Sequence, residues 1–216
     1  MLKIYGVYKS RATRPLWLAG ELGLAFEHIP VIQGYKLDNP AAADAQINTT
    51  SKAFLEMCPM GVVPAIDDDG LVLFESMAIN LYLAKKNGGP LAPKDLAEDA
   101  LMTQWSFFAA TEVETNALTI SKAAAEGRLE SSKAEVEGAA RLLKRPFAVL
   151  EKHFTSNDYA VGGRFTVADI NLAETVRYAQ AHTPLFDAHP HVRDWLARCQ
   201  SRPAFKAMWE KRLAEV

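Results

Sequence analysis

Strand-forming segments are confined to the first part of this 216-residue chain, and this distribution limits the folds it can adopt. The apolar runs expected to form strands are interleaved with helical patterns. The strand-like runs cover residues 2–6, 26–32 and 62–74, the last of them a hairpin, and the helical patterns cover residues 14–23, 54–57 and 76–86. A βαβ unit followed by a helix and a ββα unit predicts an α/β domain with a mixed four-stranded sheet in which one strand is antiparallel.

The segment NGGPLAPKD at residues 87–95 has the composition of a linker, with two Gly and two Pro in nine residues. Beyond it the strand signals vanish. Residues 98–125 form one long helical pattern. Apolar residues spaced by four and three along residues 136–154 predict a second helix, which Pro146 should kink or split. The predicted domains are residues 1–86 for the α/β domain, 87–95 for the linker and 96–216 for an all-helical domain.

A local signal for a helix start lies at FTVADI, residues 165–170. Thr166 is the expected N-cap, and Asp169 stands three residues later, where an acidic side chain can complete a capping box. Phe165 and Ile170 are placed as a hydrophobic staple. The expected role of this motif is stability, worth about 1 kcal/mol, and we assign it no chemistry.

Charge and composition exclude several classes of function. A net charge of −2 and a pI near 6.2 give no field that would attract nucleic acid or an anionic membrane. No apolar run approaches the roughly 20 residues of a membrane helix, and the strand-like start of the chain has no signal-peptide pattern, so the expected location is the cytoplasm. Cys58 and Cys199 are too few for a disulfide framework, and no Cys/His spacing suits a metal, so no metal is expected.

The hairpin GVVPAIDDDGLVLFES, residues 61–76, contains a proline in an apolar strand. Proline cannot donate to a sheet and is confined to strand starts, edges and bulges, and the residue before it is extended. The main chain of Val63 is therefore expected to be free to pair with an extended peptide by strand addition. The alternative is that Pro64 ends a strand with no ligand.

Two polar residues, Glu75 and Ser76, end this hairpin just before a helical pattern. Ser76 is the expected N-cap of that helix, whose N-terminus would attract a carboxylate. Glu75 beside it would hold an ammonium group. Together with Val63, this arrangement suits the amino-acid end of a short peptide. The alternative is an ordinary N-cap beside a surface carboxylate.

These residues belong to a set of motifs through which the sequence resembles the cytosolic glutathione transferases over nearly its full length. The resemblance rests on LKIYG followed by SRATR, FLEMCPMGVVPAIDDDGLVLFESMAINLYL, GGRFTVADINL and HPHVRDWLARCQSRPAF. It implies a thioredoxin-like first domain, a cis bond before Pro64, a homodimer, and glutathione as co-substrate. It also implies that Val63 pairs with the cysteinyl unit, while Glu75 and Ser76 hold the γ-glutamyl amine and carboxylate.

The chemistry of that family depends on a lowered pKa of the glutathione thiol. Free thiols titrate near pH 8.5, and lowering the pKa by one unit needs about 1.36 kcal/mol of preferential thiolate stabilisation. Ser10 is the expected donor, because SRATR resembles the serine-type, bacterial-like subfamilies and no cysteine lies nearby. The alternatives are the hydroxyls of Tyr5, Tyr8 and Thr13, another group, or no catalytic side chain.

Cations gather around Ser10 in the sequence, at Lys9, Arg11 and Arg14. Cations at a helix N-terminus oppose its dipole, so attraction of an anionic tripeptide would offset the cost. Arg11 is an expected glutathione contact, and a solvated surface cluster is the alternative.

The resemblance also implies a cation for the glycyl carboxylate of glutathione. Lys52, on the segment where the family often places one, is the expected residue, and Lys36 is the alternative. The connection at residues 34–50 is longer and more polar than the family's usual one, which leaves this assignment open.

The second substrate is expected to bind between the two domains, against the first long helix. Trp105, Phe108 and Thr111 are the expected pocket residues, with Phe107 as a further candidate. An aromatic cluster at helical spacing also forms a core, which is the alternative for these residues.

The expected function is conjugation of the glutathione thiolate to a hydrophobic electrophile, with Ser10 stabilising the thiolate. The alternatives are a glutathione-dependent peroxidase or isomerase, and a non-catalytic glutathione-binding interaction module. The signature of the isomerase branch is absent around residues 9–13, and a scaffold would need none of Ser10, Glu75 and Ser76. The predicted partners are glutathione, the electrophile and a second copy of the chain, with no nucleic acid and no membrane.

Overall fold

The computed structural model describes residues 1–215, and the chain divides into two compact units. The first unit contains residues 1–87 together with the segment that begins at Pro203, and the second contains residues 88–202. The predicted boundaries differ from this division, because they assign the final segment to the helical domain. That segment packs on the first unit through apolar contact: the ring of Phe205 lies 4.9 Å from the ring of Trp17.

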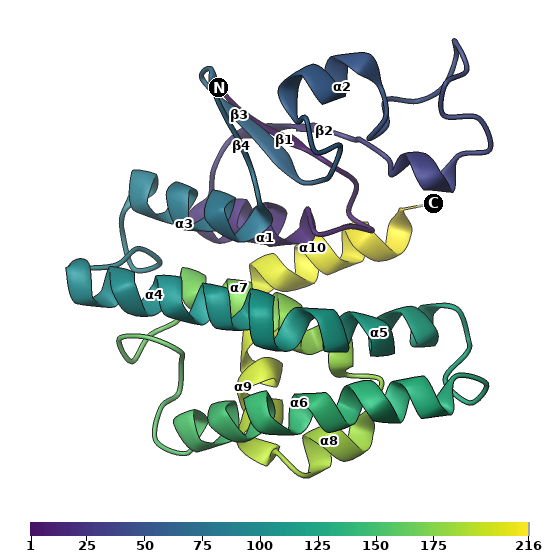
Figure 1. Ribbon diagram of the computed structural model, residues 1–216. Helices are drawn as coiled ribbons and strands as arrows, with labels where there is room; N and C mark the ends of the chain where they lie inside the picture. The colour runs from purple at the N-terminus through teal and green to yellow at the C-terminus, as the bar shows by residue number, and fades with distance from the viewer. Residues whose placement is uncertain (216) are drawn as a thin grey trace. The chain divides into compact units, whose positions relative to one another are not determined.

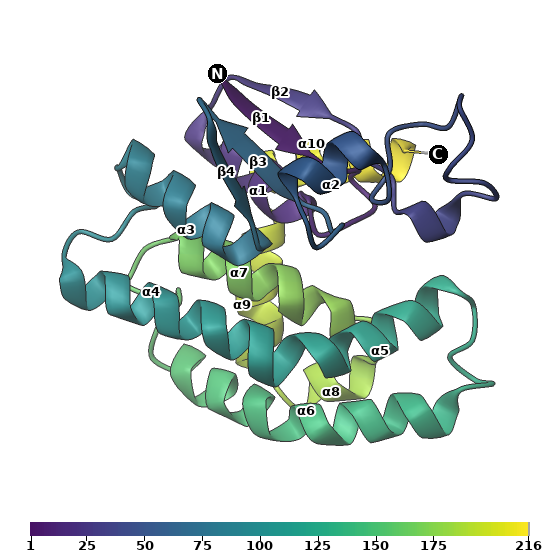
Figure 2. The ribbon, with the colours of Figure 1, turned by 45° about the horizontal axis from the view of Figure 1, so that its top comes forward.

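The first unit contains a four-stranded sheet (Figure 1). Its strand order is β2-β1-β3-β4 (Figure 2). Its strands are β1 at Leu2–Tyr5, β2 at Phe26–Ile29, β3 at Ala65–Asp68 and β4 at Leu71–Phe74. β1 pairs in parallel with β2 and antiparallel with β3, which pairs antiparallel with β4. The structure therefore confirms the predicted mixed four-stranded sheet with one antiparallel strand.

Helices cover both faces of this sheet (Figure 2). Ile4 and Ile66 are paired across β1 and β3 and are fully buried. One face of the sheet is covered by α1 and α3 (Figure 2). On the opposite face Ala65 joins a core cluster with Phe54 of α2. The helices of this unit are α1 (Thr13–Leu22), α2 (Lys52–Met57), α3 (Ser76–Asn87) and α10 (Pro203–Ala214), with a short 3-10 helix η1 at Gly34–Lys36.

The second unit is helical, as predicted. Its elements are α4 (Leu96–Phe108), a π-helical segment η2 (Ala109–Val113), α5 (Glu114–Ala125), α6 (Lys133–Phe154), α7 (Val167–Val176), a 3-10 segment η3 (Arg177–Ala179), α8 (Thr183–Asp187) and α9 (Pro190–Gln200). The predicted single helix at residues 98–125 is wrong in detail, because η2 interrupts it. Of the two effects predicted for Pro146, the split does not occur, since α6 continues past it with Leu143 and Phe147 fully buried.

The capping box at the start of α7 is confirmed. The Thr166 main-chain N–H donates to Asp169 Oδ2 at 2.9 Å, and the Thr166 side chain accepts from the main chain of Asp169. Trp195 Nε1 donates to the other carboxylate oxygen at 2.9 Å, so this motif also ties α7 to α9. Among residues 1–215, no helix is both long and apolar enough to cross a bilayer.

Candidate functional site

The Val63–Pro64 peptide bond is cis, and it lies directly before β3. Within residues 1–215, the main chain of Val63 makes no hydrogen bond to the rest of the protein. Its side chain is buried at 8% exposure in the cluster that contains Phe54. Val63 is therefore anchored by its side chain, while its N–H and C=O groups have no partner within the described residues.

Gly6 allows Val63 to lie close to the start of the first helix. Its φ is +136°, and a Cβ at this position would lie 2.9 Å from the Cβ of Ala12 and 3.1 Å from the Cβ of Val63. Only glycine accepts this backbone conformation without strain. The close approach brings Val63 next to the turn that carries Ser10.

Ser10 lies in the turn between β1 and α1, half-buried. Its hydroxyl donates to the Val7 carbonyl oxygen at 2.6 Å and accepts from the Ala12 N–H at 3.0 Å. The cap position of α1 is Ala12, whose side chain cannot cap. Ser10 thus precedes the helix by a turn, and its hydroxyl already has one donor pointing at it.

The residues that carry the alternative hydroxyls make contacts of their own. Tyr5 packs on the cluster of α2, with its ring 6.4 Å from Phe54, and burial raises the pKa of its phenol. Thr13 is fully buried, and its hydroxyl donates to the Ser10 carbonyl oxygen at 3.2 Å. The ring of Tyr8 packs edge-on against His28 at 5.0 Å.

Glu75 and Ser76 lie at the start of α3, but their roles differ from the prediction. Ser76 is the first residue of α3, and the Ile79 N–H bonds to the Glu75 carbonyl oxygen at 2.9 Å, so Glu75 holds the cap position. The prediction of Ser76 as N-cap is wrong by one residue. Its buried hydroxyl instead accepts a hydrogen bond from Arg14 Nη1 at 2.8 Å.

Glu75 combines an exposed side chain with a strained backbone. Its φ is +69°, in the left-handed region that costs a non-glycine residue about 1–3 kcal/mol. No side-chain hydrogen bond or ion pair of Glu75 occurs within the described residues. Strain combined with an unengaged carboxylate favours a binding role over a structural one.

The three predicted cations near Ser10 do not form one cluster. Arg14 is buried at 2% exposure and reaches the start of α3, whereas Lys9 and Arg11 are exposed. Arg14 is therefore an internal link between the Ser10 turn and Ser76, and not part of a solvated surface.

The long connection between β2 and α2 is organised by Asn48, which the sequence did not single out. Asn48 is fully buried, and its amide donates to the carbonyl oxygens of Pro40 at 3.0 Å and Gln46 at 2.9 Å. Lys36 and Lys52 lie at the two ends of this connection, each exposed. Desolvation, with repulsion from Arg212 and Lys9, lowers the pKa of Lys36, while Glu215 opposes this.

The predicted electrophile residues occupy three environments in the helical unit. Trp105 is buried, with its ring 4.9 Å from His153 and 5.3 Å from Phe108, and so belongs to the helical core. Phe108 is half-buried at the end of α4. Thr111 is exposed inside η2, and its hydroxyl donates to the Phe107 carbonyl oxygen at 3.1 Å.

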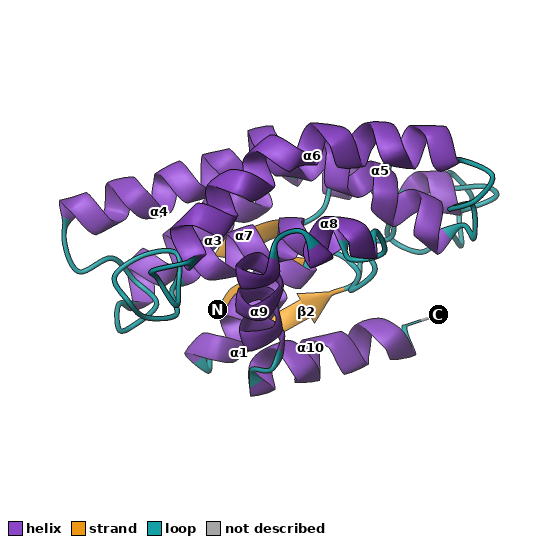
Figure 3. Cartoon of the chain, turned by 90° about the horizontal axis from the view of Figure 1, so that it is seen from below, coloured by secondary structure: helices purple, strands orange, loops and turns teal. Residues whose placement is uncertain are grey.

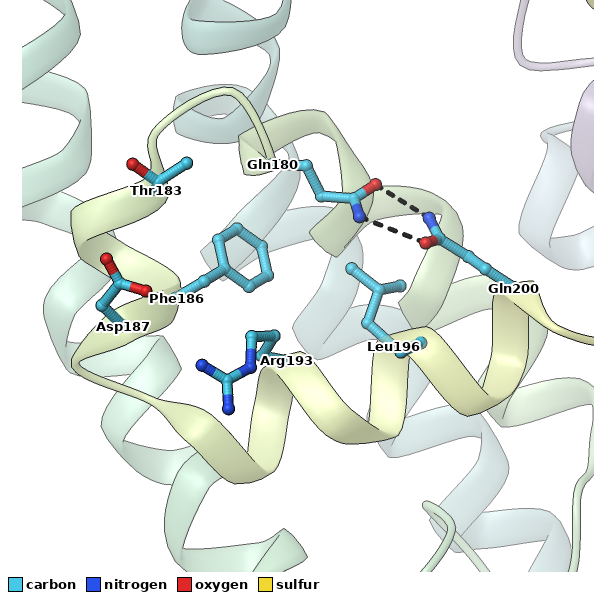
Figure 4. Close-up of a pocket in the computed structure, with 8 residues that line it drawn as sticks. Gln180, Thr183, Phe186, Asp187, Arg193, Leu196 and Gln200 are labelled. Carbon is cyan, nitrogen blue, oxygen red and sulfur yellow. Dashed lines mark hydrogen bonds between the residues drawn. The ribbon is translucent and has the colours of Figure 1, made fainter.

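A pocket of about 220 Å³ occurs elsewhere in the helical unit, between α8 and α9 (Figure 4). Gln180 and Gln200 close one side through reciprocal amide hydrogen bonds of 3.1 and 2.8 Å. The other lining residues are Thr183, Phe186, Asp187, Arg193, Leu196 and Ala197. None of the predicted site residues lines this pocket. Within residues 1–215, no group of three His, Cys, Asp or Glu side chains is placed to hold a metal.

Comparison with known proteins gives consistent matches along the chain. The N-terminal domain of glutathione S-transferase matches residues 1–85, and the C-terminal domain matches residues 100–203. Glutathione S-transferase 3 of Zea mays is 33% identical over 215 residues, covering 95% of this chain and 91% of that protein. These matches confirm the predicted fold class, a thioredoxin-like domain followed by an all-helical one.

A second relative and a solved structure extend the comparison. Probable elongation factor 1-gamma 2 of Arabidopsis thaliana is 35% identical over 181 residues, which cover 80% of this chain and only 43% of that protein's length. A glutathione transferase family member from Pseudomonas fluorescens Pf-5, solved with two glutathione bound, aligns with a TM-score of 0.79 and 26% identity. The alignment covers 96% of this chain and 91% of that chain.

Proposed function

The chain belongs to the glutathione S-transferase family, and we propose that it binds glutathione and adds the thiolate to an apolar electrophile. The observation that carries this proposal is the available main chain of Val63 beside the Ser10 turn, brought together at Gly6. An extended tripeptide paired with Val63 would place its cysteinyl sulfur near this turn.

The γ-glutamyl end of glutathione would bind at Glu75 and Ser76. The exposed Glu75 carboxylate suits the ammonium group. The Ser76 hydroxyl accepts from Arg14, so its own proton remains to be donated to the ligand carboxylate. The adjacent residues Glu75 and Ser76 would thus bind the ammonium group and the carboxylate of an α-amino acid.

Ser10 would stabilise the thiolate by turning its hydroxyl proton from the Val7 carbonyl toward the sulfur. The Ala12 N–H that points at Ser10 Oγ polarises the hydroxyl and makes it a better donor, because hydrogen bonds in a chain strengthen one another. The proposed mechanism is therefore of the serine type, with Ser10 as the donor.

Cations around the tripeptide would complete the site. Lys52, exposed at the first position of α2, is the proposed partner of the glycyl carboxylate, and Lys36 is the alternative. Arg11, exposed beside Ser10, is a proposed contact that attracts the anionic tripeptide.

The apolar electrophile would contact the helical unit near η2. Phe108 and Thr111 are the proposed contacts, because they are accessible, and the buried Trp105 would support Phe108 from behind. A π-helical segment frequently marks a functional position in a helix, and η2 includes Thr111.

A homodimer is the proposed assembly. The edge strand β4 exposes apolar side chains: Leu71, Val72 and Phe74 are 44%, 38% and 39% exposed. An exposed apolar edge strand is a ready interaction surface. Light scattering should give about twice the mass of the chain, and the expected location is the cytoplasm.

A non-catalytic glutathione-binding module is the second candidate, favoured by the 35% identity to an elongation factor 1-gamma. Turnover of glutathione with an apolar aryl halide separates the two candidates. We expect measurable conjugation by the wild-type protein and a loss of about 10²-fold in Ser10→Ala, the size expected when a preorganised donor to a developing charge is removed. Binding of glutathione without conjugation would favour the second candidate. Replacing the aryl halide by a peroxide tests peroxidase activity.

A further inference from the structure

The last helix, α10, lies along α1 (Figure 3). At one end, Ala204 packs against Gly20, where an added Cβ would lie 3.4 Å from the Ala204 Cβ. The next contact is the edge-on pair of Trp17 and Phe205. These contacts fix the line of α10, so its carboxyl-terminal end reaches the turn at the opposite end of α1, where Ser10 lies.

Two side chains at that end form hydrogen bonds with the main chain of the residues before Ser10. Glu215 accepts the Tyr8 N–H on Oε1 at 2.7 Å and the Lys9 N–H on Oε2 at 2.5 Å. Arg212 donates from Nη1 to the Tyr8 carbonyl oxygen. Residues three apart share one face of a helix, so both side chains approach the same short stretch of main chain.

The setting of Glu215 shows that these contacts are specific. A carboxylate at a helix carboxyl terminus is unfavourable because of the helix dipole, and the Glu215 N–H still bonds to the Lys211 carbonyl oxygen at 3.0 Å, in helical register. Nearby cations, Arg212 and Lys36 among them, offset the unfavourable interaction of this carboxylate with the helix dipole. Hydrogen bonds from two N–H groups to one carboxylate are charge-assisted and stronger than neutral ones.

We propose that Glu215 and Arg212 are positioning residues that hold the Tyr8–Lys9 main chain so that Ser10 presents its hydroxyl to the bound thiol. They touch neither substrate and act through Ser10. This inference rests on the proposed function. It explains why the final helix packs on the first unit: the helix serves as a brace for the turn that carries the proposed donor.

The test is the pKa of the glutathione thiol bound to the full-length protein, followed by thiolate absorbance against pH. Glu215→Gln keeps the size of the side chain but offers an amide donor to one of the two N–H groups. We expect the pKa of the bound thiol to rise and kcat/KM below pH 7 to fall about tenfold, mostly in kcat. KM for glutathione should change less than about twofold, because the binding contacts are untouched.

The matched control is Glu210→Gln, which removes the same charge from an exposed position on α10 with no described contact. It should leave the pKa of the bound thiol unchanged. A fall in that pKa in Glu215→Gln would overturn the inference, because it would show that the carboxylate acts only by its charge. An unchanged pKa would overturn it as well.

A double-mutant cycle with Ser10→Ala tests whether Glu215 acts through Ser10. In the Ser10→Ala background, Glu215→Gln should have no further effect on the thiol pKa, and an undiminished effect contradicts the inference. If Glu215→Gln lowers the melting temperature, Arg212→Met is measured in the same way. A raised thiol pKa is then expected, and an unchanged thiol pKa would contradict the inference. A normal thiol pKa in the wild-type protein would refute the proposed function itself and so is distinguishable from failure of the positioning role.

Discussion

Arg14 Nη1 donates a 2.8 Å hydrogen bond to Ser76 Oγ, although the two residues are 62 positions apart in the chain. This bond joins the helix that follows the Ser10 turn to the helix that begins after Glu75. Because both side chains are buried, at 2% and 5% exposure, the bond is shielded from water. The two halves of the proposed glutathione site are therefore coupled through one guanidinium.

Arg14→Met should weaken glutathione binding about tenfold, because a charged hydrogen bond that orients Ser76 is lost, and such bonds contribute about 1.5–3 kcal/mol. Calorimetric titration with glutathione measures this directly. Arg141→Met, at an exposed position on α6, is the control and should bind normally. Ser76→Ala should add little to Arg14→Met, and full additivity would contradict the coupling.

Glu75→Gly should change stability and binding in opposite directions. Glycine adopts the φ of +69° without the steric cost, so the free energy of unfolding should rise by about 0.5–1 kcal/mol. Glutathione binding should fall, since the carboxylate for the ammonium group is gone. Urea unfolding and titration test both effects. Glu75→Gln, which keeps the strain, should lose binding without gaining stability.

Gly6→Ala should disrupt the site and destabilise the protein. Its Cβ would lie 2.9 Å from the Ala12 Cβ, at a φ of +136° that alanine rarely adopts. We expect a loss of about 2 kcal/mol or more in unfolding free energy, with glutathione binding lost. Gly138→Ala in α6 is the matched control: nothing lies within 4 Å of its added Cβ, and it should gain about 0.5–1 kcal/mol.

Stability below pH 4.5 should depend on Glu98 of the helical unit. Arg164 binds its carboxylate through two hydrogen bonds of 2.9 and 2.7 Å and holds the pKa of Glu98 at about 2. Because the folded pKa is depressed, the contribution is complete above the ordinary value of 4.5 and is lost as the pH falls toward 2. The expected loss is about 2 kcal/mol, allowing for the part of Arg164 open to solvent.

The measurement is urea unfolding between pH 2 and 5, compared with Arg164→Gln, in which this pH dependence should be flattened. Burial raises the pKa of Asp169 from 3.8 to about 6, so this carboxyl ionises in the unfolded state before it ionises in the folded state. Its contribution to stability therefore falls as the pH rises toward 6. This opposite trend is present in both proteins, and their difference isolates Glu98. Equal slopes in the two proteins would refute the assigned role of Arg164.

Local rules predicted the β3–β4 hairpin and the capping box because each depends on neighbouring residues. The apolar runs and the Asp-Gly turn define β3 and β4, and the pairing of Thr166 with Asp169 spans three residues. The error at Ser76 has the same origin. A helix boundary depends on φ at one residue, and no pattern of residue types shows that Glu75 adopts a left-handed conformation.

The contacts that link distant segments could not be predicted. Glu215 reaches Tyr8 across 207 positions, and the pattern around Glu215 is that of an ordinary helix end. Arg14 has a cationic sequence neighbourhood that suggested a surface cluster, yet tertiary packing buries it. The π-helical η2 has no signature in residue types, because Ala109 to Val113 favour an ordinary helix.

The most direct test of the proposed catalysis is the thiol titration of glutathione bound to the wild-type protein and to Ser10→Ala. We expect a bound-thiol pKa at least about one unit below the free value near 8.5 in the wild type, and a return toward that value in Ser10→Ala. A bound thiol that titrates like free glutathione in the wild-type protein would contradict the proposed catalysis. A pKa lowered equally in both proteins would show that Ser10 is not the donor.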